Sequence, residues 1–157
     1  MKIGFGYDIH RLVPGRPLRL GAVEVPFDKG LEGHSDGDVL LHAIGDALLG
    51  ASNLGDLGKY FPSGDPQYQG ISSGILLAEI RAMLALKQWE IVNIDSTVVA
   101  EQPRLQSWIP AMKEKIAQIL GIEGSQVSVK AKTNEGMGVV GQGDAMAAFA
   151  VALLDKK

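Results

Sequence analysis

The sequence predicts a single α/β domain (α+β) in which a mixed β-sheet carries helices packed on one face. Segments with strand-like and helix-like periodicity alternate along the whole chain. With 157 residues, 46% of them apolar, the chain is long enough to bury one core, and the scarcity of aromatic residues makes that core aliphatic. No repeat, low-complexity tract or linker interrupts the pattern. We therefore expect residues 1–157 to form one domain.

Charge and residue usage exclude several classes of protein. A net charge of −3 argues against a general nucleic-acid binder or a polybasic membrane anchor. Because the sequence has no cysteine, any metal site must use histidine, aspartate or glutamate. No apolar run is long enough to span a bilayer, and Lys2 leads directly into a strand-like pattern instead of a signal peptide. We expect a cytoplasmic protein without nucleic-acid or membrane partners.

Residues 2–10 alternate as a β-strand does. One face of this strand carries the apolar side chains of Ile3, Phe5, Tyr7 and Ile9. The other face carries Asp8 and His10, which converge because residues two apart point the same way. A turn at residues 14–17 leads to residues 18–25, which predict an edge hairpin.

The next element is an apolar helix, predicted over residues 36–51 with Ser35 as its cap. Its few polar side chains, Asp38, His42 and Asp46, are spaced four apart and therefore lie on one side of the helix. This spacing makes Asp38 and Asp46 the two candidates for holding the second ring nitrogen of His42, and it assigns neither of them.

A long segment rich in Gly, Pro and Asp follows at residues 53–66. Loops of this length in a compact domain are often ligand-binding loops. Backbone N–H groups in this segment, or those at the helix start near His34 and Ser35, suit phosphate binding. Ordinary turns and an ordinary helix cap explain the same residues equally well.

The rest of the chain predicts two helices, at residues 73–88 and 107–120, and strands at residues 91–100 and 126–133. The β-branched segment 91–100 is expected to be largely buried. The last segment, 144–154, fits either an Ala-rich helix or a central strand.

Asp8, His10 and His42 form the one grouping with metal-binding chemistry. Two imidazoles and a carboxylate suit zinc or a similar divalent ion, and three ligands leave a coordination position open. The alternative is that Asp8 and His10 are the solvated face of an edge strand and that His42 is a core histidine with satisfied hydrogen bonds.

The motifs described above resemble those of a known family. The chain is similar to the 2-C-methyl-D-erythritol 2,4-cyclodiphosphate synthase family over nearly its whole length. The pattern H-S-D-G-D-x-x-x-H at residues 34–42 is the most specific element. The other matching motifs are D-x-H at 8–10, G-D-x-G at 55–58, and the segments 61–66, 100–103 and 130–135.

The resemblance implies a ring-closing reaction. The 2-phosphate of 4-diphosphocytidyl-2-C-methyl-D-erythritol 2-phosphate attacks the β-phosphate of the same molecule, and CMP leaves. The cyclic diphosphate then enters isoprenoid precursor biosynthesis. The resemblance also implies a homotrimer with its sheets around the threefold axis and an active site between neighbouring subunits.

The resemblance also assigns residues. Asp8, His10 and His42 would hold Zn²⁺, and Glu135 would bind Mg²⁺ or Mn²⁺ bridging the diphosphate. His34 and Thr133 would stabilise the transition state, and residues 100–106 would form the cytosine pocket. The implied substrate-binding residues are Asp8, Ile9, His10, His34, Ser35, Asp56, Leu57, Gly58, Phe61, Pro62, Ser63, Gly64, Asp65, Ala100, Pro103, Arg104, Leu105, Lys132, Thr133, Asn134 and Glu135.

The chain departs from the family pattern at four positions. Lys132 stands where a threonine is common, and Arg104 where a lysine is common. Val139 and Gln142 replace an aromatic residue and an arginine that face the trimer axis in the family, where prenyl diphosphates bind. The metal ligands and Thr133 are retained.

Two other functions stay open. One is a different metal-dependent phosphoryl enzyme, such as a phosphodiesterase that activates water at the same three ligands. The other is a non-catalytic trimer that binds a nucleotide or a metal ion without turnover.

Overall fold

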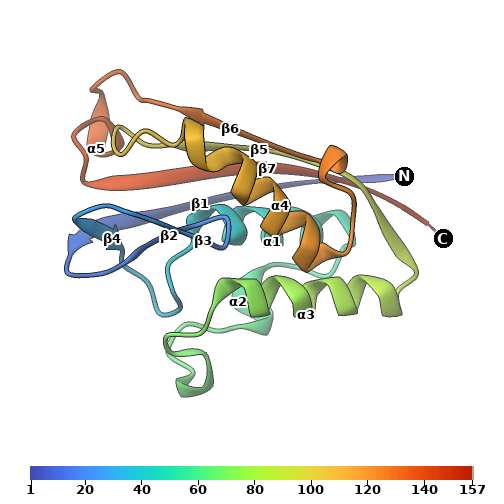
Figure 1. Ribbon diagram of the computed structural model, residues 1–157. Helices are drawn as coiled ribbons and strands as arrows, with labels where there is room; N and C mark the ends of the chain where they lie inside the picture. Colours follow the sequence, from blue (N-terminus) through green and yellow to red (C-terminus); the bar gives the residue numbers. More distant parts are fainter. Residues whose placement is uncertain (157) are drawn as a thin grey trace.

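The computed structural model describes residues 1–156, which form a sheet layer with helices on one side (Figure 1). The five-stranded sheet has the order β4-β1-β7-β5-β6, and β2 and β3 form a separate hairpin. The strands are β1 Lys2–Pro14, β2 Leu18–Leu20, β3 Val23–Val25, β4 Lys29–Leu31, β5 Trp89–Val99, β6 Val127–Lys132 and β7 Ala145–Lys156. The helices are α1 Val39–Ala51, α2 Leu57–Tyr60, α3 Ser73–Leu86, α4 Ile109–Leu120 and α5 Gly138–Gly141, with short 3₁₀ turns η1 Pro66–Tyr68, η2 Gln106–Trp108 and η3 Gly124–Gln126.

The sheet is mixed, as predicted. Strands β1 and β5 both pair with β7 in antiparallel orientation, whereas β5 and β6 are parallel. The ambiguous segment 144–154 is therefore the central strand and not a helix. Its small residues Ala148, Ala150 and Ala152 are buried, which leaves room for α1 to pack closely on the sheet.

Two glycines of β1 bring α1 into direct backbone contact with the sheet. Gly4 and Gly6 are buried on the face toward the helix. A Cβ atom on Gly6 would lie 1.9 Å from the carbonyl oxygen of Ala43, and one on Gly4 would lie 2.0 Å from that of Ala47. Because Asp8 and His10 continue the same face of β1, this close approach fixes α1 directly opposite them.

The helix α1 begins later than the sequence predicts. Gly37 adopts a φ of +76°, which ends the preceding loop, and Asp38, not Ser35, caps the helix by accepting from the Leu41 N–H at 3.1 Å. The fully buried Asp38 carboxylate also accepts from the N–H groups of Gly21 at 3.0 Å and Ala22 at 2.8 Å. It therefore ties the β2–β3 turn to α1. Burial raises the pKa of Asp38, although these backbone hydrogen bonds oppose that shift.

The predicted helices at 73–88 and 107–120 are confirmed as α3 and α4. Helix α4 carries Pro110 in its first turn and ends at Gly121, which has a φ of +64°. This distribution follows the preference of proline for helix starts and of glycine for helix ends. No helix within residues 1–156 combines the length and apolar character needed to cross a membrane.

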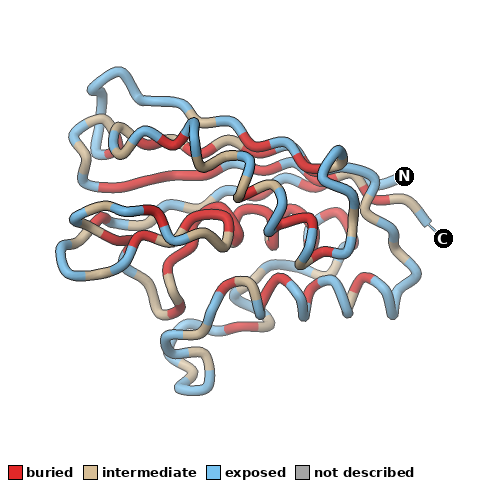
Figure 2. The backbone as a smooth tube through the Cα atoms, viewed as in Figure 1, coloured by how far each residue is buried: buried red, intermediate tan, exposed pale blue. Residues whose placement is uncertain are grey.

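Residues 1–156 leave most of the far face of the sheet uncovered (Figure 2). At one end of this face Val140 of α5 packs against Ala145 and Ala147 of β7. The apolar side chains of β1 that alternate with Asp8 and His10 point to this face, where Ile3 is 72% exposed. Phe149 and Val151 of β7 lie on the same face, with the Phe149 ring 5.1 Å from that of Tyr7. The prediction that residues 91–100 are largely buried is wrong, because helices cover only one side of β5 and only alternate side chains from Ile94 onward are buried.

Candidate active site

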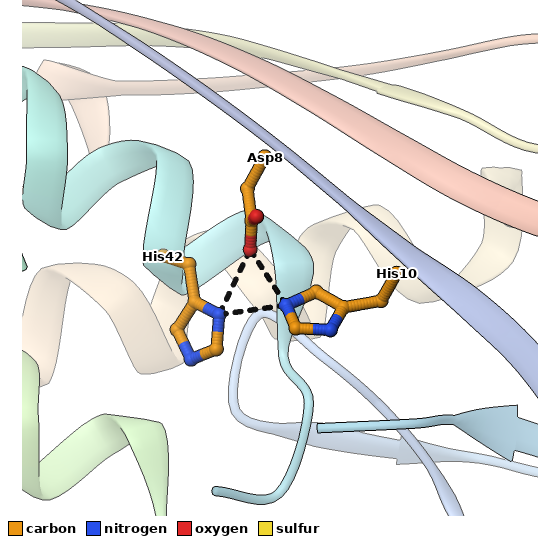
Figure 3. A group of neighbouring side chains, drawn as sticks. All are labelled: Asp8, His10 and His42. Carbon is orange, nitrogen blue, oxygen red and sulfur yellow. Dashed lines mark hydrogen bonds and ion pairs between the residues drawn. The ribbon is translucent and has the colours of Figure 1, made fainter. Parts of the chain in front are cut away.

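Asp8, His10 and His42 converge where β1 crosses the first turns of α1 (Figure 3). The Oδ2 atom of Asp8 lies 2.7 Å from His10 Nε2 and 2.9 Å from His42 Nδ1. The two imidazole nitrogens are 3.1 Å apart. One ligand atom from each residue lies within 4.8 Å of the other two, so the three residues can share one metal ion.

The remaining ring nitrogens have partners of their own. His10 Nδ1 lies 2.5 Å from the carbonyl oxygen of Glu32, so it is the donor nitrogen of that ring. His42 Nε2 lies 2.9 Å from the Ser73 hydroxyl and 3.1 Å from the Ser35 hydroxyl. Each histidine therefore turns one nitrogen toward the shared centre while a fixed group holds the other. This is the arrangement that metal-binding histidines adopt.

The electrostatics of the three residues suit a cation. Burial would raise the pKa of Asp8, but hydrogen bonds from His10 and His42 outweigh it and lower the pKa to about 2. For His10, burial opposes the charged form, yet the hydrogen bond to Asp8 raises its pKa overall. The carboxylate thus stays ionised and draws positive charge to the centre, which is what a divalent ion would supply.

The expectation that Asp38 or Asp46 holds His42 is wrong. Asp38 faces the β2–β3 turn, as described above, and Asp46 accepts from the Leu57 N–H at 2.8 Å. Burial raises the pKa of Asp46. Ser35 and Ser73 take the place predicted for the aspartates. Ser73 lies 31 residues from His42 and on another helix, so local spacing gives no signal for it.

A pocket of about 210 Å³ opens above the three residues. It is built from β1, the start of α1 and the segment around α2. The predicted residues that line it are Asp8, His10, His34, Ser35, His42, Leu57, Gly58, Phe61 and Ser63. The imidazole of His34 is held by a 2.8 Å hydrogen bond between its Nε2 and the carbonyl oxygen of Asp65.

The segment 53–66, expected as a loop, contains the short helix α2. Asp56 caps this helix by accepting from the Lys59 N–H at 3.0 Å, and Asp65 caps the η1 turn. Asp56 and Asp65, together with Pro62 and Gly64, belong to this segment but do not line the pocket. Ile9 points to the opposite, uncovered face of the sheet and is 40% exposed.

The other predicted residues lie in a second group at the ends of the parallel strands β5 and β6. They are Ala100, Pro103, Arg104, Leu105, Lys132, Thr133, Asn134 and Glu135, and none of them lines the pocket above Asp8. A single chain therefore does not bring the two groups together. The Ala100 N–H donates to the Lys132 carbonyl oxygen at 2.9 Å, so the two strand exits are joined.

Glu101, which lies within the predicted cytosine pocket at residues 100–106, organises this second group, a role that the sequence did not indicate. Its Oε1 accepts from the N–H groups of Asn134 at 2.6 Å and Gly136 at 3.4 Å. It thereby holds the turn that carries Thr133 and Glu135, whose side chains approach each other at 3.4 Å. The family motif at residues 100–103 includes Glu101, but the resemblance assigned substrate binding only to Ala100 and Pro103 of these four residues. The contact between Glu101 and the turn at 134–136 depends on the tertiary structure, so the sequence carries no signal for it.

Comparison with known proteins identifies close relatives. The sequence profile of the YgbB family matches residues 1–155. The 2-C-methyl-D-erythritol 2,4-cyclodiphosphate synthase of Symbiobacterium thermophilum is 56% identical over 154 residues, covering 98% of each chain. The bifunctional IspDF of Campylobacter jejuni matches with a TM-score of 0.96 and 36% identity over 99% of this chain and 42% of that one. A solved 2C-methyl-D-erythritol-2,4-cyclodiphosphate synthase in a CDP-bound form matches with a TM-score of 0.90 and 33% identity, covering 98% of this chain and all of that one.

Proposed function

This chain belongs to the YgbB family of 2-C-methyl-D-erythritol 2,4-cyclodiphosphate synthases, enzymes of isoprenoid precursor biosynthesis, and we propose that it catalyses the family's ring closure in the cytoplasm. An oxygen of the substrate 2-phosphate forms a bond to the β-phosphorus of the diphosphocytidyl group. The bond between the β-phosphorus and the bridging oxygen breaks, and CMP leaves with that oxygen. The CDP-bound relative supports a cytidine-linked substrate.

The convergence of Asp8, His10 and His42 at the floor of the pocket is the observation that carries this proposal. These residues would hold Zn²⁺, and Glu135 would bind a second ion, Mg²⁺ or Mn²⁺, at the diphosphate. When bound, the ions neutralise the charge that two approaching phosphates concentrate. A chain with net charge −3 cannot provide that neutralisation through its overall field.

The protein's own residues position the substrate. His34 lies in the pocket and donates its Nε2–H to the Asp65 carbonyl, so Nδ1 faces the phosphates and donates to them when the ring is the imidazolium. Ser35, Asp56 and Gly58 would hold the methylerythritol part, and Thr133 would act with His34 at the reacting phosphate. The nucleophile belongs to the substrate, so catalysis needs positioning and charge stabilisation and no nucleophilic side chain.

The separation of the two residue groups supports a homotrimer. We propose that the strand-exit group at residues 100–106 and 132–135 of one subunit completes the pocket of its neighbour and receives the cytidine. The uncovered apolar face of β1 and β7 supports burial around the threefold axis, because monomeric proteins rarely expose contiguous apolar patches of this kind.

The double substitution Ile3→Glu and Val151→Glu is expected to yield monomers that still bind zinc but show little turnover. The subunits should separate because buried, unpaired carboxylates in the interface disfavour assembly. Zinc binding should persist because Asp8, His10 and His42 all come from one chain. Sedimentation velocity, zinc titration and CMP release would measure the three effects. The matched control is Ile75→Glu with Leu86→Glu, two exposed apolar positions on α3 away from the sheet. An active trimer of the Ile3/Val151 variant would contradict the proposed interface.

The proposed reaction is tested by supplying the diphosphocytidyl phosphate substrate with zinc and magnesium. Equal amounts of CMP and cyclic diphosphate support the synthase. CMP with a linear product would instead indicate hydrolysis by a phosphodiesterase, and binding without CMP release would leave a non-catalytic protein.

Replacing His34 with alanine is expected to leave zinc affinity unchanged and to lower kcat by about 100- to 1000-fold, because it removes one donor to the reacting phosphates but no metal ligand. Metal content by mass spectrometry and CMP release would be measured on the same preparation. Loss of zinc from the His34→Ala protein would show that this histidine acts at the metal and not at the substrate.

A further inference from the structure

A pair of side chains behind His42 is not used by the proposed reaction. Ser73, the first residue of α3, is 1% exposed, and its hydroxyl lies 2.9 Å from His42 Nε2. The same hydroxyl lies 2.5 Å from Asp36 Oδ1, in the loop that precedes α1. The Asp36 Oδ2 atom accepts from the Ser73 N–H at 3.0 Å.

The direction of these hydrogen bonds follows from the groups involved. A carboxylate only accepts, so the Ser73 hydroxyl donates its single proton to Asp36. The Ser73 oxygen then has only lone pairs left and accepts from the N–H of His42 Nε2. With the Nε2 proton fixed in this way, Nδ1 is the nitrogen that can give its lone pair to a metal ion. It faces Asp8 and His10 at 2.9 and 3.1 Å and donates to Asp8 only while no metal is bound.

The same contacts join the two helices. Besides accepting from Ser73, Asp36 donates its own backbone N–H to the Ile71 carbonyl oxygen at 3.0 Å, just before α3. The start of α3 and the loop before α1 are therefore held together by three hydrogen bonds around Ser73. His42 projects from α1 onto this junction, so the orientation of its ring depends on where α3 docks.

We propose that Asp36 and Ser73 form a positioning pair that fixes the tautomer and the ring orientation of His42, and thereby sets the metal affinity of the centre. The inference rests on the proposed metal site at Asp8, His10 and His42. Hydrogen-bond partners behind a metal-binding histidine typically contribute about 10- to 100-fold in metal affinity. The Ser35 hydroxyl, at 3.1 Å from Nε2, offers a weaker second acceptor, because it also accepts from the Gly37 N–H at 3.3 Å.

The test compares zinc dissociation constants, measured by competition with a chromophoric chelator on the full chain. Ser73→Ala is expected to weaken zinc binding by about 10- to 100-fold, and Asp36→Asn to weaken it in the same direction. Ser72→Ala is the matched control. Its hydroxyl caps α3 through the Gly74 N–H at 3.2 Å and does not contact His42. A thermal unfolding curve for each variant separates loss of the helix cap from loss of the histidine contact.

A second comparison tests whether Asp36 acts on His42 through Ser73. Because Asp36 acts on His42 through the Ser73 hydroxyl, the double variant Asp36→Asn with Ser73→Ala should bind zinc no more weakly than Ser73→Ala alone. In the zinc-loaded wild type, the His42 Nε2 proton should be protected from solvent exchange in NMR spectra, and that protection should be lost in Ser73→Ala.

Equal zinc affinities for Ser73→Ala, Ser72→Ala and the wild type would overturn the positioning pair while leaving the proposed function intact. Additive losses of zinc affinity in the double variant would contradict the claim that Asp36 acts on His42 through Ser73. A wild-type protein that binds no zinc would overturn the metal site itself, and with it both proposals.

Discussion

Replacing His42 with alanine is expected to abolish high-affinity zinc binding and to reduce turnover by at least about 1000-fold. Removal of the imidazole leaves Asp8 and His10 as the only ligands from the three-residue centre. A metal ion at a reacting phosphate supplies several kcal/mol of charge stabilisation, which corresponds to this loss in rate. Zinc content after dialysis and the rate of CMP release would be measured together.

Asp46→Asn is the matched control for that experiment. Asp46 lies one helical turn beyond His42 on the same side of α1 and lines the same pocket, but it accepts from the Leu57 N–H and makes no hydrogen bond to Asp8, His10 or His42. Asparagine retains an oxygen that can accept from Leu57, so zinc content should match that of the wild type. A His42→Ala protein with full zinc content and full activity would contradict the assignment of the ligands.

The grouping of Asp8, His10 and His42 that the structure shows could be predicted, because two of its members are placed by local geometry. Residues two apart in a strand point the same way, which brings Asp8 and His10 together without knowledge of the fold. His42 followed from the family motif and from its place on an apolar helix. By contrast, the partners Ser73 and Glu32 are joined to the histidines only by tertiary contacts. Periodicity carries no information about such contacts.

The errors in the fold prediction have a related cause. Alternation in β1 and the β-branched run of β5 correctly indicated strands with apolar faces. Alternation does not say what covers a face. Within residues 1–156, α1, α3 and α4 cover one side of the sheet, and only the short helix α5 reaches the other. The cap of α1 was misplaced because Asp38 gains two further N–H donors from the β2–β3 turn, which is 16–17 residues away in the sequence.

Replacing Gly6 with alanine is expected to destabilise the fold by more than about 3 kcal/mol and to weaken zinc binding as well. The added Cβ would lie 1.9 Å from the Ala43 carbonyl oxygen and 2.8 Å from the Ala47 nitrogen, and both are backbone atoms that cannot rotate away. Overfilling a packed contact costs about 1 to 3 kcal/mol when side chains can adjust, and more when they cannot. Relief therefore requires α1 and β1 to move apart.

That separation would act directly on the proposed metal centre, because His42 directly precedes Ala43 on α1 while Asp8 and His10 belong to β1. Metal–ligand distances tolerate deviations of only about 0.2 Å, so a displaced helix cannot keep all three ligands. Gly50→Ala is the matched control: Gly50 is an exposed residue of the same helix with open space around its Cβ position. A Gly→Ala exchange stabilises a helix interior by about 0.5 to 1 kcal/mol; Gly50 lies in the last turn of α1, so we expect a smaller gain there and an unchanged zinc affinity. Urea unfolding and zinc competition would measure the stability and the zinc affinity of both variants. A Gly6→Ala protein with the stability and zinc affinity of the wild type would show that the direct contact between α1 and β1 does not position the site.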